Sequence, residues 1–246
     1  MIAQARAELL KIRSTRTTNG IVLGLIALIL LFSLFNGLLT PQSSLTSTEN
    51  QRGLLSAGSL AGVFSALAGV MLVTSEYRFG TIRPTFLFTP RRSRVIAAKL
   101  AAGLLAGLAF AVVGEGIGFT IGYLCLSGRG ISYALSGGQT TLLVLGTLAG
   151  VALWAALGVG LGLVIRNQVG AIIGLLAWGF VAETLLFQFV PSVGRFAPVH
   201  AQNALMGLTA DRGHLLPAAA GGATLLAWTG AFALAGTALT ARRDVN

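Results

Sequence analysis

The stretch SEYRFGTIRPTFLFTPRRSRVIAAK, from Ser75 to Lys99, is the long polar segment between strongly apolar runs of this 246-residue chain. It contains six basic residues and a single acid, Glu76. The basic residues are Arg78, Arg83, Arg91, Arg92, Arg94 and Lys99. Cytoplasmic loops of membrane proteins carry this kind of excess of Lys and Arg. The stretch is therefore predicted to be a cytoplasmic loop between two membrane helices.

Apolar and aromatic side chains are interleaved with the charges of this loop. They are Phe79, Ile82, Phe86, Leu87 and Phe88. Aromatic residues and arginines concentrate where two protein surfaces meet, so we expect a partner to bind here. Gly80 favours the end of the preceding helix, and Pro84 suits the first turn of a short helix that runs to Phe88. Thr89 and Pro90 form an N-cap and first-turn pair that opens the next helix.

The composition is that of an integral membrane protein. The chain is 54% hydrophobic and only 10% charged, and its mean hydropathy is +0.82. A soluble domain of this size carries far more charge. The net charge of +10 would suit a nucleic-acid ligand, but thirteen of the seventeen basic residues fall on one side of the predicted membrane. Membrane orientation accounts for this bias, and we expect no nucleic-acid partner.

Hydropathy predicts an all-α polytopic membrane protein, a single transmembrane domain (residues 1–246) with six transmembrane helices. The expected spans are Gly20–Leu39, Leu54–Thr74, Val95–Leu126, Thr140–Ile165, Val169–Val190 and Pro217–Thr240. Both termini and the 75–94 loop are predicted to face the cytoplasm, because the opposite side holds only four basic residues. Residues 1–18 are predicted to form an interfacial helix. A signal peptide fits less well, since the apolar run that follows has the ~20 residues of a membrane span.

The polar loop resembles the cytoplasmic signature between the second and third helices of type-2 ABC exporter permeases. The residues that carry the resemblance are Glu76, Tyr77, Arg78, Gly80, Thr81, Ile82, Arg83, Thr89, Pro90, Arg91, Arg92 and Lys99. Length, helix number and the run from Arg166 to Gly170 extend the resemblance more loosely over the whole chain. In that family the loop is the coupling element that seats in a groove of a separate ATP-binding subunit.

The resemblance implies a set of roles for this chain. The loop residues expected to couple to the ATPase are Glu76, Tyr77, Arg78, Gly80, Thr81, Arg83, Phe86, Phe88, Pro90 and Arg91. ATP and Mg would bind to the partner ATPase, and a second permease copy, identical or related, would complete the pathway. The segment 191–216 would fold back as short helices that cap the outer side. The expected location is a bacterial cytoplasmic (inner) membrane.

Glu115 and Glu183 are the two carboxylates inside apolar spans. A charge at that depth costs roughly 2.5–3.5 kcal/mol or more, so each should be protonated, water-facing or hydrogen-bonded between helices. They are candidates for the transport path of a cationic or amphiphilic cargo, or for ties between helices. Glycines at four-residue spacing between Gly103 and Gly122 predict close helix packing, either inside the chain or against a second copy.

Enzyme motifs are missing from the sequence. A Walker A loop has Gly directly before its Lys, whereas Lys11 follows Leu10 and Lys99 follows Ala98. The sequence therefore predicts a non-catalytic permease that exports hydrophobic or amphiphilic molecules such as drugs, antibiotics, peptides or lipids. A proton-coupled secondary transporter that uses Glu115 and Glu183 is the alternative, and a non-transporting membrane scaffold is a third. His200 and His214 are predicted to be ordinary polar loop residues.

Overall fold

The computed structural model describes residues 7–10, 16–82, 84, 87, 92–209 and 215–242. All regular elements in these ranges are helical. They are α2 (Arg16–Leu39), α3 (Gln42–Leu45), α4 (Thr48–Leu55), the 3-10 turn η1 (Ser56–Leu60), α5 (Ala61–Arg78), α7 (Arg92–Gly128), α8 (Gly137–Ile165), α9 (Gln168–Ala177), the π-helical turn η2 (Trp178–Ala182), α10 (Glu183–Phe189), α11 (Pro191–Gly194), α12 (Pro198–Leu205) and α13 (Ala218–Arg242).

Within the described residues, six helical runs are long and apolar enough to cross a bilayer. They are Thr18–Leu39, Thr48–Arg78, Arg92–Gly128, Gly137–Ile165, Gln168–Phe189 and Ala218–Arg242. The predicted all-α architecture with six helices long enough to span a membrane is thus confirmed in the described part of the chain, although the second and third helices are longer than the hydropathy boundaries suggested. The proposed interfacial helix is described only at residues 7–10, which are helical, and the proposed coupling helix only at residues 84 and 87.

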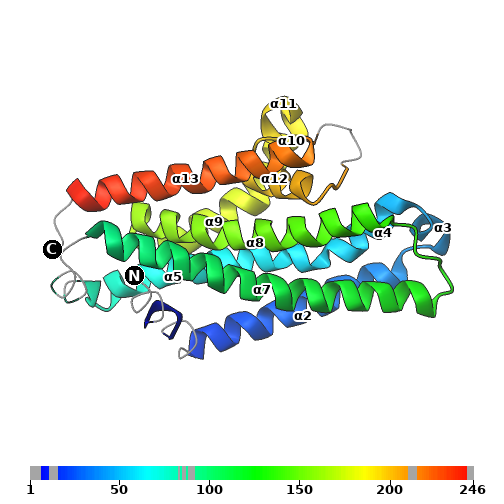
Figure 1. The fold of residues 1–246 in the computed structure, drawn as a ribbon, viewed down its shortest axis with the longest axis horizontal. Coiled ribbons are helices and arrows are strands. Elements are labelled where there is room, and N and C mark those ends of the chain that lie inside the picture. The colour runs from blue at the N-terminus through cyan, green and yellow to red at the C-terminus, as the bar shows by residue number, and fades with distance from the viewer. Residues whose placement is uncertain are drawn as a thin grey trace.

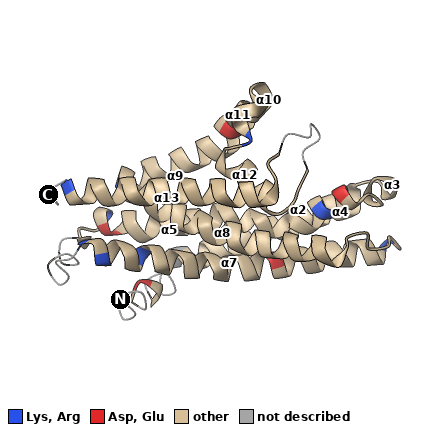
Figure 2. Ribbon diagram, turned by 45° about the horizontal axis from the view of Figure 1, so that its top comes forward, with Lys and Arg blue, Asp and Glu red and all other residues tan. Residues whose placement is uncertain are grey.

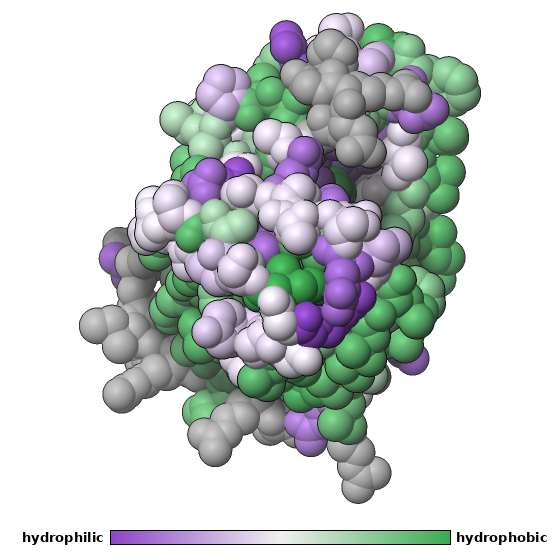
Figure 3. Space-filling view, turned by 90° about the vertical axis from the view of Figure 1, so that its right-hand side faces the viewer, coloured by the Kyte–Doolittle hydropathy of each residue, from purple (hydrophilic) through white to green (hydrophobic). Residues whose placement is uncertain are grey.

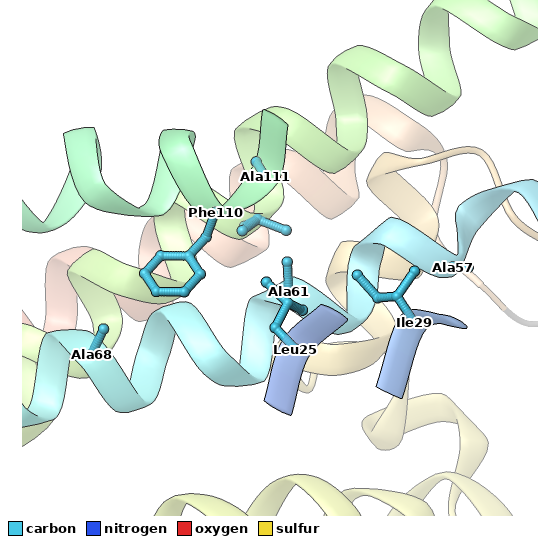
Figure 4. Packing of buried hydrophobic residues seen from close by; sticks show 8 residues of the cluster. Leu25, Ile29, Ala57, Ala61, Ala68, Phe110 and Ala111 are labelled. Atoms are coloured by element: carbon cyan, nitrogen blue, oxygen red, sulfur yellow. The ribbon is translucent and has the colours of Figure 1, made fainter. Parts of the chain in front are cut away.

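The long helices run along one axis of the molecule, and α8 lies between α13 and α7 (Figure 1). It packs against α5, α7 and α13, while α2 packs mainly on α7. One core cluster joins α2, η1, α5 and α7 through small alanines that meet larger side chains such as Leu25, Ile29 and Phe110 (Figure 4). Because alanine keeps helices close, three backbones converge around these few side chains.

The two ends of the bundle differ in charge. We call the end formed by Arg78 of α5, Arg92 and Lys99 of α7, Arg166 after α8 and Arg242 of α13 the basic end; Figure 2 shows Lys and Arg gathered there. The opposite end carries α3 and α4, and we call it the α3–α4 end. Seen end-on, it is largely polar, and apolar residues cover much of the flanks (Figure 3). This is the distribution expected when the flanks face lipid and the ends face water.

The glycines of α7 are used for packing inside the chain. A Cβ on Gly107 would lie 2.7 Å from the Cβ of Ala155 in α8, and a Cβ on Gly118 would lie 2.7 Å from the backbone nitrogen of Gly58 in η1. The predicted close packing is therefore observed, and its partners are α8 and η1 of the same chain. A second copy has no room to use this stripe as a dimer face.

Alanine substitutions on α7 test this packing. Gly118→Ala should lower the free energy of unfolding by about 1–3 kcal/mol, because the new methyl group overpacks the contact with η1. Gly116→Ala is the control, since nothing lies within 4 Å of its Cβ position. That change should be neutral or stabilise by up to about 1 kcal/mol, as alanine favours helix over glycine. Thermal unfolding in detergent would measure both, and equal midpoints would contradict the packing.

Candidate functional site

A buried cation with two carboxylates organises the basic end. The ammonium of Lys99 lies 2.8 Å from Glu76 Oε1 of α5 and 3.0 Å from Glu8 Oε2. It also donates a hydrogen bond of 3.2 Å to the backbone oxygen of Leu72. Lys99 is only 1% exposed. Its three acceptors match the three N–H groups of an ammonium, so α7 is tied to both α5 and the N-terminal segment.

Two further residues of the signature contact other elements. The guanidinium of Arg166 lies 5.1 Å from the ring centre of Tyr77, which is the geometry of a cation–π contact. Arg166 adopts a left-handed conformation with φ 56° and closes the end of α8. The exposed side chain of Arg78 donates to Gln168 Oε1 of α9 at 3.2 Å. Glu76, Tyr77 and Arg78 thus reach α7, the α8–α9 turn and α9 respectively.

Arginine side chains then connect α13 to the same end. Arg92 of α7 donates to the backbone oxygen of Thr240 at 2.7 Å, and Arg166 donates to that of Leu239 at 3.4 Å. Carbonyls in the last turn of a helix lack intrahelical partners, so a guanidinium is a favourable cap there. We call these contacts, together with those of Lys99, Tyr77 and Arg78, the tie network. It connects α5, α7, the α8–α9 turn, α9 and α13.

The rest of the predicted loop is described only in part. Gly80 has φ +70° and lies just after α5, as the sequence predicts for a helix-ending glycine. Thr81 is exposed, and Ile82 is buried within the chain, so Ile82 is not available to a partner as its place in the apolar set had suggested. Phe79 and Leu87 are 70% and 80% exposed. Arg83, Phe86, Phe88, Pro90 and Arg91 lie outside the described residues.

Glu183 is fully buried and accepts a hydrogen bond from the first turn of the short helix α12. Its Oε2 accepts a hydrogen bond of 2.8 Å from the backbone nitrogen of Val199, the second residue of that helix. Amide groups in the first turn of a helix have no intrahelical acceptor, and a carboxylate also suits the positive end of the helix dipole. His200 Nδ1 lies 4.0 Å from the same oxygen, and the His200 ring stacks on Phe187 at 4.0 Å.

Glu115 is buried in α7 against the second span. The Glu115 backbone lies so close to Gly58 of η1 that a Cβ atom added to Gly58 would collide with Glu115. Neither carboxyl oxygen receives a hydrogen bond from a described residue. Thr147 of α8 is the polar side chain beside it, and the Thr147 hydroxyl donates to the backbone oxygen of Leu143 at 2.9 Å. The structure therefore gives Glu115 a packing position between helices and leaves its oxygens unused.

Sequence reasoning misses two of these contacts. It treats Lys99 as a loop cation and does not pair it with Glu8, and it treats His200 as a loop residue although His200 lies on α12 beside Glu183. The other histidine, His214, falls outside the described residues. Within the described ranges, no three His, Cys, Asp or Glu side chains are grouped as a metal site would require. Comparison of the chain with protein-family models and with curated proteins finds no match.

Removal of the buried cation should destabilise the fold. Lys99→Met leaves Glu8 and Glu76 without their charge partner and should lower the free energy of unfolding by about 3–5 kcal/mol. Adding Glu76→Gln should recover part of this loss, because one buried charge is then removed. Arg94→Met is the control, since Arg94 is exposed on the same helix, and it should change stability by less than about 0.5 kcal/mol. Denaturant unfolding in detergent micelles would compare the three variants.

Substitution of Glu183 should act through α12. Glu183→Gln keeps a side-chain oxygen for the amide of Val199, so the helix should remain capped. Glu183→Leu leaves that buried amide unpaired, and the loss should be about 1–3 kcal/mol. Limited proteolysis of segment 191–216, together with unfolding midpoints, would show the difference. Equal protection in the two variants would mean that the Val199 contact does not hold α12.

Proposed function

We propose that this chain is the membrane-spanning subunit of an ATP-binding-cassette exporter. It would move hydrophobic or amphiphilic cargo, such as a drug, antibiotic, peptide or lipid, out across a bacterial cytoplasmic membrane. The basic end and both termini would face the cytoplasm, where Lys and Arg accumulate in membrane proteins. The fold supports a membrane location through its six apolar helices, and the contacts next to the loop support a coupling role. The assignment to this transporter class depends on the signature from Glu76 to Lys99.

The tie network is the observation that carries the proposal. The signature residues Glu76, Tyr77 and Arg78 stand at the end of α5, immediately before the proposed coupling segment. Each contacts a different element, and two arginines connect α13 as well. A displacement of the loop by a moving ATPase would therefore act on several spans together. Such transmission needs contiguous contacts between the loop and the spans. The contacts of the tie network join the end of α5, where the loop begins, to α7, α9 and α13.

The partner would supply the energy and the second half of the pathway. ATP and Mg would bind to a separate ATPase subunit, which would contact the apolar residues of the loop. Phe79 and Leu87 are exposed next to the basic end and suit such a contact. Glu115 and Glu183 are enclosed by helices of this one chain. We therefore expect the cargo path at a face shared by two permease copies, identical or related, rather than at these two carboxylates.

A proton-coupled secondary transporter remains the second candidate. It draws support from Glu115, whose buried carboxyl group has no hydrogen-bond donor among the described residues. Glu183 supports it less, because its carboxylate already caps α12. Transport that survives ATP depletion but collapses with the proton gradient would favour this candidate over the exporter.

Reconstitution with the ATPase tests the coupling role. Phe86→Ala combined with Phe88→Ala should weaken ATPase binding by about 2 kcal/mol or more, if these aromatics are buried on association. Arg83→Ala should leave binding intact but reduce cargo-stimulated ATP hydrolysis and export together. Leu142→Ala is the control, because it truncates a partly exposed leucine of α8 near the α3–α4 end, away from the loop. Wild-type binding, hydrolysis and export in the loop variants would remove the main support for the exporter.

A further inference from the structure

A cavity of about 610 Å³ opens at the α3–α4 end, far from the tie network. It lies where α2, α4, α10 and α12 approach one another, and its size is that of a site for a drug-sized molecule. Apolar and polar groups share its wall. Phe32 of α2 and Phe187 of α10 line it together with Asn36, Glu49, Asn50 and His200.

The polar groups of this cavity are amides, hydroxyls, an imidazole and one carboxylate, that of Glu49. The amide nitrogen of Asn36 already donates to the backbone oxygen of Phe32 at 2.9 Å, and that of Asn50 donates to Ser44 at 2.8 Å. Their carbonyl oxygens can accept hydrogen bonds from a ligand. Glu49, in the first turn of α4, is an acceptor with a negative charge, and it receives a hydrogen bond from the hydroxyl of Thr209. A ligand that donates hydrogen bonds or carries positive charge matches this wall.

The charges of the residues that line the cavity also favour a cationic ligand. Among the described residues that line it, Glu49 is the single carboxylate, and none is Lys or Arg. Arg52 and Arg129 belong to this end but are not among the lining residues. Arg52 donates to the backbone oxygen of Gly207, and Arg129 donates to those of Gly37 and Thr40. Burial lowers the pKa of the His200 imidazole, so that ring is neutral at pH 7. Glu49 is therefore the one charged side chain among the described residues that line the cavity.

Aromatic rings complete the match. The face of a phenylalanine ring attracts an organic cation by about 0.5–2 kcal/mol, depending on how far water is excluded. Phe32 and Phe187 come from two different helices and line one cavity. We propose that this cavity binds an amphiphilic organic cation, with Glu49 facing the charge and the two phenylalanines facing the apolar body. As a statement of cargo class it rests on the proposed exporter, whereas the binding itself does not.

Two ions of nearly equal size and shape but opposite charge provide the test. Tetraphenylphosphonium and tetraphenylborate would be titrated separately against the purified full chain in lipid nanodiscs, and binding to protein-free nanodiscs would be subtracted. The expected result is saturable binding of the phosphonium, at least tenfold tighter than any saturable binding of the borate. Comparable saturable binding of the two ions, or a preference for the borate, would overturn the proposal.

Substitutions then locate the site. Glu49→Gln removes the charge, keeps an oxygen for Thr209, and should weaken phosphonium binding about tenfold, while Glu49→Asp should retain most of the affinity. Glu49 is exposed in a short helix, so folding should survive; Gln42→Ala, on the neighbouring α3 and outside the cavity, is the control and should bind like the wild type. Unchanged affinity in Glu49→Gln would place the phosphonium elsewhere and refute the assignment. ATP is absent from these measurements, so failure of the exporter proposal would leave their outcome unaffected.

Discussion

The buried ammonium of Lys99 holds the basic end together. Two carboxylates and a backbone oxygen surround it, and these acceptors come from α5 and from the N-terminal segment. A charge in an apolar interior is tolerated only when it is paired and hydrogen-bonded. If α7 moved away from α5, the charges of Lys99, Glu76 and Glu8 would lose partners in apolar surroundings, which is costly. This requirement makes the start of α7 and the end of α5 a rigid pair. The loop that joins them therefore begins and ends on a fixed base.

The tie network adds directional contacts to that base. Arg166 and Arg92 donate to carbonyls near the end of α13, and Arg78 donates to the side chain of Gln168 in α9. These are surface or half-buried contacts, each of modest strength by itself. Their value lies in the number of helices that they connect, since a load applied at the loop is shared between α5, α7, α9 and α13. A merely solvated basic loop has no need of such an arrangement.

Close helix packing in the opposite half of the bundle depends on glycines, which have no side chain. Gly58 of η1 lets the second span approach Glu115, and Gly62 of α5 and Gly150 of α8 leave room for the side chain of Gln202 from α12. Glu183 caps the N-terminus of α12, and Gln202 packs against the glycines of α5 and α8, so the short helix is held both at its start and along its length. This placement brings His200 and Phe187 to the cavity at the α3–α4 end. Close backbone packing thus shapes the site that we assign to an organic cation.

The sequence by itself determined the all-α class, the six apolar helices and the place of the polar loop between the second and third of them. The length of an apolar run and the charge of a loop are local properties, and a bilayer selects for both without reference to distant residues. The sequence also placed the helix end at Gly80, which a left-handed glycine marks locally. Only the tertiary structure decided what the polar residues inside the bundle do. Glu8 and Lys99 are 91 residues apart, and Glu183 and Val199 belong to different helices, so no local pattern pairs them. Such contacts arise when helices pack, because a buried charge or amide without a partner is costly, and the partner can come from a distant segment of the chain.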